Sequence, residues 1–199
     1  DEVDVDHVPP KQFYATDVRR KHSPNLFTLP VHRKCHEPYQ IDEDYFVHSI
    51  APLAMSSYTG GEIWKDIVGR RKRPEGNRIH EMVYREFDPS PSGLLLPDGK
   101  VVKRFNGTRV WGIVWKITRG LFFKEIGRYL PDNTPRNCKI YSEGEKPASD
   151  FDYVRDTPSR GDYPGVLDYK FIQINFSLAF IICTNPTFAL PLHLGIIHK

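Results

Sequence analysis

The sequence has few cysteines, no long apolar run and almost no excess of charge. Only three cysteines occur among its 199 residues, without any repeated spacing, which excludes a disulfide scaffold and predicts a reducing, cytoplasmic location. No apolar segment reaches the roughly 20 residues that a membrane span requires, so we expect no membrane partner. The formal net charge of +3 is too small to indicate nucleic acid by itself.

The remaining composition is typical of a globular protein. With 39% hydrophobic and 27% charged residues, a chain of this length can bury a core without disulfides or metals. The 17 prolines and 14 glycines predict many turns. Because the chain starts at Asp1 and its two methionines, Met55 and Met82, are internal, we expect the native protein to have residues upstream of Asp1.

Hydrophobic patterning predicts an α+β fold with two regions. Residues 1–50 are polar and turn-rich and are expected to form one compact unit, whereas residues 51–199 form an α+β region of unknown role. An acidic run at 42–44 suits the start of a helix, which Pro52 limits. A second helix is predicted at 62–68, directly before a basic run.

The strongest helical pattern covers residues 108–129. Its apolar positions recur every three or four residues, and Lys116 and Arg119 are left for other faces, where core packing with an exposed basic edge explains them. The alternation of apolar and polar residues over 171–183 predicts two neighbouring core strands. Further strands are predicted at 80–87, at 94–105 with a hairpin turn at 97–99, and at 139–141.

Three short N-terminal segments contain residues that could bind a metal ion or act as a general base. They are Asp4-Val5-Asp6-His7-Val8-Pro9-Pro10, Asn25-Leu26 and His32-Arg33-Lys34-Cys35-His36. A carboxylate directly before a histidine puts an oxygen ligand for a metal beside a possible general base, and a later histidine offers another ligand. This set suits phosphodiester hydrolysis, in which a divalent ion polarises the phosphate while an imidazole takes a proton from water.

In order and spacing, residues 4–46 resemble the HNH, or His-Me finger, endonuclease family. The similarity is strongest to a bacterial and phage-type subgroup with a His-Val-Pro-Pro segment, a zinc-binding pair and an Asp-Glu-x-Tyr-Phe continuation. The resemblance implies an N-terminal ββα-metal finger in which His7 is the general base and Asn25 orients the hairpin and the imidazole. Asp6 and His36 would hold one catalytic divalent ion, with Mg²⁺ as the physiological choice and Mn, Zn or Ni able to bind the same ligands.

The chain departs from that subgroup at the structural zinc site. Relatives close a tetrahedral site with two pairs of ligands, and only the second pair, His32 and Cys35, is present here. Two explanations are open: either the first pair lies upstream of Asp1, so that the chain is truncated within its finger, or the protein has no zinc and Cys35 is a small buried thiol.

The resemblance also implies nucleic acid, DNA rather than RNA, as the partner. Candidate phosphate contacts are the basic residues Arg19, Arg20, Lys21, Arg70, Arg71, Lys72 and Arg73. A noncatalytic nucleic-acid-binding or structural protein with a degenerate finger is the first alternative. An unrelated domain with incidental histidines is the second, and the oligomeric state is left open.

Overall fold

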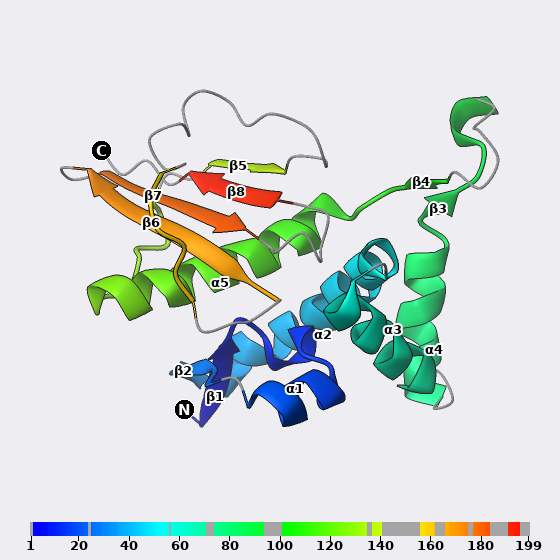
Figure 1. The fold of residues 1–199 in the computed structure, drawn as a ribbon, viewed down its shortest axis with the longest axis horizontal. Coiled ribbons are helices and arrows are strands. Elements are labelled where there is room, and N and C mark those ends of the chain that lie inside the picture. The colour runs from blue at the N-terminus through cyan, green and yellow to red at the C-terminus, as the bar shows by residue number, and fades with distance from the viewer. Residues whose placement is uncertain are drawn as a thin grey trace.

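The structure is a computed structural model with an α+β fold (Figure 1). An N-terminal hairpin and helix are followed by a helical middle and a C-terminal antiparallel sheet. The residues that the structure describes are 2–23, 25–55, 57–70, 74–93, 101–134, 137–140, 156–161, 166–174, 177–183 and 191–195.

The N-terminal part contains a strand pair followed by a helix, as the family resemblance implies, with η1 and α1 inserted between the two strands. Strands β1 and β2 form an antiparallel pair in which Asp6 lies opposite Leu29, and α2 follows β2 without a loop. The elements are β1 (Val3–Val8), the 3₁₀ turn η1 (Lys11–Phe13), α1 (Thr16–His22), β2 (Phe27–His32), α2 (Arg33–Ile50) and the 3₁₀ turn η2 (Ala51–Ala54).

Helix α2 begins at Arg33, so the prediction that a helix starts at the acidic run 42–44 is wrong. These carboxylates lie inside the helix because two of them have cationic partners on a later helix: Asp42 pairs with Arg109 at 3.0 Å, and Glu43 with Lys116. They are therefore tertiary ion-pair partners and do not mark a helix N-terminus. The helix ends before Pro52, as predicted.

The middle of the chain is more helical than its pattern predicts. The helix predicted at 62–68 is confirmed within α3, but the strand predicted at 80–87 is wrong, because α4 runs to Tyr84. Ile79 and Val83, one helical turn apart, pack on the core from α4. The elements are α3 (Tyr58–Arg70), α4 (Pro74–Tyr84), β3 (Phe87–Asp88), the 3₁₀ turn η3 (Pro91–Gly93) and β4 (Val102–Lys103), of which β4 pairs with β3. The turn predicted at 97–99 lies outside the described residues.

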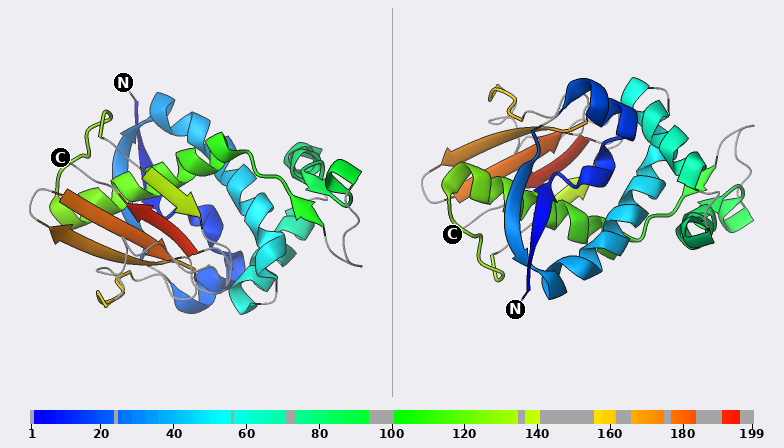
Figure 2. Two further views of the ribbon diagram at one scale, coloured as in Figure 1. Left: turned by 90° about the horizontal axis from the view of Figure 1, so that it is seen from above. Right: turned by 90° about the horizontal axis from the view of Figure 1, so that it is seen from below.

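Helix α5 (Gly107–Ile126) confirms the strongest prediction from the sequence. Asn106 caps its start by accepting the Arg109 backbone N–H at 3.2 Å, and Gly127 ends it with a positive φ of 72°. The helix lies between the C-terminal sheet and the N-terminal unit (Figures 1 and 2). Both of its sides are therefore covered, and Lys116, predicted to face outward, is only 8% exposed.

The C-terminal sheet has the strand order β5-β8-β7-β6, with every pair antiparallel. Two neighbouring strands over 171–183 are confirmed as β6 and β7, with Phe171 opposite Phe180, and the strand predicted near 139–141 corresponds to β5. The strands are β5 (Asn137–Ile140), β6 (Asp168–Ile174), β7 (Ser177–Cys183) and β8 (Pro191–Gly195). Among the described residues, we find no helix with the length and apolar character needed to cross a membrane.

Candidate metal centre

Four ionisable side chains meet where β1, α2 and α5 come together. Asp6 comes from β1, His36 and Glu43 come from α2, and Lys116 comes from α5. The side chains are between 6% and 11% exposed. A ligand atom of each of Asp6, His36 and Glu43 lies within 4.8 Å of the other two. The cluster is therefore compact enough to share one ion.

Secondary structure explains why these residues converge. Glu43 follows His36 by about two helical turns, so both lie on one face of α2. Along β1, Asp4, Asp6 and Val8 alternate with Val3, Val5 and His7, of which the two valines are exposed. The first set faces α2 and α5, and it thereby presents two carboxylates to the helix that carries His36.

Asp4 orients the His36 ring. Its Oδ2 lies 2.8 Å from His36 Nδ1, and His36 Nε2 lies 3.4 Å from Asp6 Oδ1. With Nδ1–H donating to Asp4, a neutral ring turns the lone pair of Nε2 toward Asp6. The same hydrogen bond holds the pKa of Asp4 below its usual value. A carboxylate that accepts the second N–H of a histidine is the usual support for a metal ligand.

The spacing of the ligand atoms suits one ion. Two atoms that each lie about 2.1 Å from a shared ion are separated by about 3 to 3.5 Å for bond angles between 90° and 110°. The 3.4 Å between His36 Nε2 and Asp6 Oδ1 falls in this range. A nitrogen with two carboxylates is a donor set that accepts Mg²⁺, Mn²⁺ or Zn²⁺.

Lys116 already pairs with both carboxylates and offsets one of their two negative charges. Its Nζ lies 2.6 Å from Asp6 Oδ1 and donates a hydrogen bond to Glu43 Oε1. The ammonium also lies 5.7 Å from the centre of the Tyr39 ring. Desolvation raises the pKa of Glu43, and the neighbouring Lys116 charge opposes that rise. The cluster thus has an internal cation.

His7 follows Asp6 on β1, but it points to the other face of the strand. Its ring is partly buried, and in the described part of the chain it has neither a hydrogen bond nor an ion pair. Desolvation lowers its pKa below the usual value, and the positive charge of Lys11 adds to this effect. The imidazole is therefore neutral at pH 7, the state in which it can accept a proton.

The other residues predicted for the finger are not brought into the cluster. Asn25 is exposed in the connection between α1 and β2, and His32 is exposed at the N-cap of α2. Cys35 is an exposed free thiol, so the alternative of a small buried thiol is wrong. Within the described ranges, no group of three potential metal ligands includes His32 or Cys35, so the structural zinc stays a prediction.

The predicted basic residues that the structure describes lie on two helices that pack together, α1 and α3. Arg19, Arg20 and Lys21 form the last turn of α1, and Arg70 ends α3, whereas residues 71–73 lie outside the described part. Arg20 pairs with Asp17 at 2.7 Å, and Lys21 donates to the Tyr58 hydroxyl at 2.6 Å. These two cations are thus already engaged within the protein.

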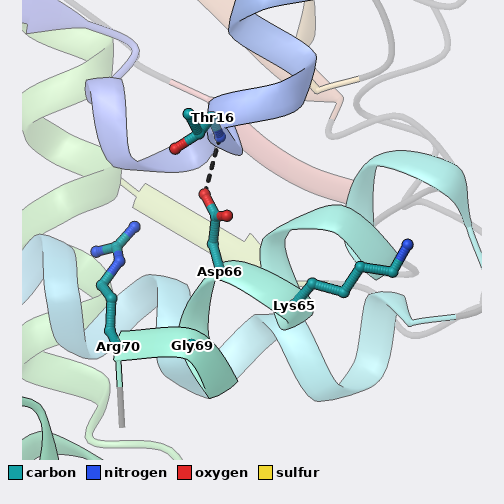
Figure 3. Close-up of a pocket in the computed structure, with 5 residues that line it drawn as sticks. All are labelled: Thr16, Lys65, Asp66, Gly69 and Arg70. Carbon is teal, nitrogen blue, oxygen red and sulfur yellow. Dashed lines mark hydrogen bonds between the residues drawn. The ribbon is translucent and has the colours of Figure 1, made fainter. Parts of the chain in front are cut away.

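A hollow of about 360 Å³ lies between α1 and α3 (Figure 3). Its wall is held together by Asp66, which accepts the Thr16 backbone N–H at 2.8 Å. Lys65 and Arg70 extend from α3 on either side of Asp66 (Figure 3). The hollow is lined by residues outside the Asp6, His36 and Glu43 cluster.

Asp4, Glu43 and Lys116 belong to the cluster but were not predicted as members of it. A signal for Asp4 was present, because it is two residues before Asp6 and therefore shares its side of a strand. Lys116 also had a signal: it lies three residues after the core residue Ile113 and four before Gly120, at the spacing of the apolar stripe. Glu43 carried no such signal, because its burial depends on α5.

No family model, curated protein or solved structure matches this chain. The resemblance of residues 4–46 to the HNH family therefore gains no support from these comparisons.

Proposed function

We propose that the protein is a divalent-metal-dependent endonuclease that hydrolyses phosphodiester bonds of nucleic acid, with DNA as the expected substrate. The observation that carries this proposal is the Asp4–His36 hydrogen bond, which directs Nε2 of His36 toward Asp6 Oδ1. The antiparallel strand pair followed by a helix, with Asp6 on the first strand and His36 on the helix, supports the ββα-metal finger that the sequence resemblance implies, although η1 and α1 lie between the two strands.

Different residues have different roles in the proposed hydrolysis. Asp6, His36 and Glu43 would hold the divalent ion, which polarises the phosphate and stabilises the leaving oxygen when bound. The neutral His7 ring takes a proton from a water molecule. The oxygen of that water forms a bond to phosphorus as the bond to the leaving oxygen breaks, and the proton stays on the imidazole.

A second candidate function is nucleic-acid binding without catalysis, and one observation favours it. Asp4, His36, Asp6, Lys116 and Glu43 are joined in sequence by contacts between acidic and basic groups. With His36 protonated, two cations offset two of the three carboxylate charges without a metal. The two functions make opposite predictions about metal binding.

Metal binding tests the proposal. Titration of the protein with Mn²⁺, followed by calorimetry, is expected to give one ion per chain, and His36→Ala should abolish binding because it removes the nitrogen ligand. His22→Ala is the matched control, since His22 is an exposed histidine at the end of α1. Supercoiled plasmid should be nicked in Mg²⁺ and left intact in EDTA.

Two results would contradict the proposed endonuclease. The first is a wild-type protein that binds no Mn²⁺. The second is cleavage that continues in EDTA. A gel shift of DNA without any cleavage in Mg²⁺ would favour the noncatalytic function instead.

Asp4→Asn tests whether the support of His36 matters. We expect Mn²⁺ affinity to fall about tenfold or more, because the amide is a weaker acceptor for the Nδ1–H and leaves the imidazole less basic. Glu2→Gln is the matched control: it removes the same charge two residues earlier, where Glu2 pairs with Arg33 at 2.7 Å. Equal losses in both variants would mean that only the general field of negative charge matters.

A further inference from the structure

We propose that Lys116 is an exchangeable internal cation, which occupies the Asp6 and Glu43 carboxylates without metal and leaves them when a divalent ion binds. This inference rests on the proposed metal-dependent function and adds a residue that controls the affinity of the same site. Lys116 would then be a positioning residue, because it acts through the ligands.

The Lys116 ammonium occupies the carboxylate oxygens that the ion would use. The Lys116 ammonium contacts Oδ1 of Asp6, which is the same oxygen that lies 3.4 Å from His36 Nε2. Its second partner is an oxygen of Glu43, the third potential ligand. An ion that used Asp6 Oδ1 would therefore share its ligand oxygen with the ammonium.

Holding the Lys116 ammonium and a divalent ion in the same buried cluster would have an electrostatic cost. All four side chains are nearly buried, with Lys116 only 7% exposed, so water screens their charges weakly. A divalent ion beside the ammonium would place three positive charges next to two carboxylates. Repulsion between the cations in such a site favours the release of one of them.

The position of Lys116 on α5 allows its side chain to move while the helix stays fixed. The helix is fixed by core residues on the flanking turns, Ile113, Ile117 and Leu121, so its backbone is held in place. The lysine side chain is long and flexible, so the ammonium can move without the helix. A displaced ammonium would remain attached beside the site, as a positive charge available to an approaching phosphate.

The test compares Mn²⁺ affinity in wild-type protein, Lys116→Gln and Arg119→Gln. We expect Lys116→Gln to bind Mn²⁺ at least tenfold more tightly, because the ion no longer has to displace a cation. Arg119→Gln is the matched control, because it removes the same charge from the next turn of α5. There Arg119 pairs with the exposed Asp132 at 2.9 Å. Its affinity for Mn²⁺ should stay within about twofold of wild type.

A second measurement uses the wild-type protein, so it tests the exchange even if the Lys116→Gln variant misfolds. Acetylation by acetic anhydride, read by mass spectrometry, should be slow at Lys116 without metal and at least fivefold faster with saturating Mn²⁺. The exposed Lys65 on α3 serves as the internal reference, and its acetylation should not change.

The outcomes separate this inference from the proposed function. If wild-type protein binds Mn²⁺ and His36→Ala does not, but Lys116→Gln binds no more tightly than wild type, the exchange is disproved while the metal site stands. Unchanged acetylation of Lys116 in the metal-bound protein would also disprove it. If neither wild type nor Lys116→Gln binds Mn²⁺, both proposals fail together.

Discussion

His7→Ala is expected to lower the rate of Mg²⁺-dependent cleavage about 100-fold or more, since a positioned general base contributes about 10²- to 10⁴-fold. His7 is suited to that role by its neutral state at pH 7 and by the absence, within the described residues, of a hydrogen bond to its ring. The loss should appear in kcat, measured by the nicking of plasmid DNA at saturating Mg²⁺.

The loss of activity identifies His7 as a base only if the His7→Ala variant still binds metal. His7 is not one of the three residues that could share the ion, so His7→Ala should bind Mn²⁺ within about threefold of wild type, and His22→Ala should keep full activity. A variant that cleaves DNA at the wild-type rate would remove His7 from the mechanism. One that loses Mn²⁺ as well would make His7 a ligand instead of a base.

Gly120→Ala is expected to destabilise the fold by about 2 kcal/mol or more. A Cβ at this position would lie 2.4 Å and 2.8 Å from the two methyl carbons of Val8, which is 1% exposed on β1. Overpacking of this kind typically costs about 1 to 3 kcal/mol, and this site is more crowded than most. That cost outweighs the roughly 1 kcal/mol that alanine gains over glycine in a helix. Urea denaturation gives the free energy of unfolding.

Two further variants test whether the contact between Gly120 and Val8 is the cause. Gly112→Ala on the same helix should be neutral or stabilising, because Asp42 Oδ2, at 4.0 Å, is the only atom of the described residues that its Cβ would meet. Val8→Ala removes both clashing methyl groups and leaves only its Cβ, at 3.1 Å, so Gly120→Ala should cost much less in that variant than in the wild type. If Gly120→Ala is equally harmful with and without Val8, the close approach of α5 and β1 is not the cause.

The predictions of secondary structure were most reliable where one segment determines its own packing. Helix α5 was predicted because its apolar stripe is long and regular, and β6 and β7 were predicted from alternation. The acidic run 42–44 was misread because its partners, Arg109 and Lys116, lie far along the chain. A local pattern contains no information about such tertiary partners.

The candidate site was predictable only in part for the same reason. Asp6 and His36 were paired through the family resemblance, and the structure brings their side chains together. Lys116 was placed outward because lysines are rarely buried unless they are paired. Its burial follows from two carboxylates that are more than 70 residues away in the sequence.

The convergence of β1, α2 and α5 has a consequence for protein engineering. Residues 1–50 contain every proposed ion ligand, yet Lys116 and the surface that covers Val8 and Tyr45 come from beyond them. A graft of the hairpin and α2 onto a foreign scaffold would therefore carry a pair of uncompensated carboxylates and a bare apolar face. A portable version of this centre would have to include α5.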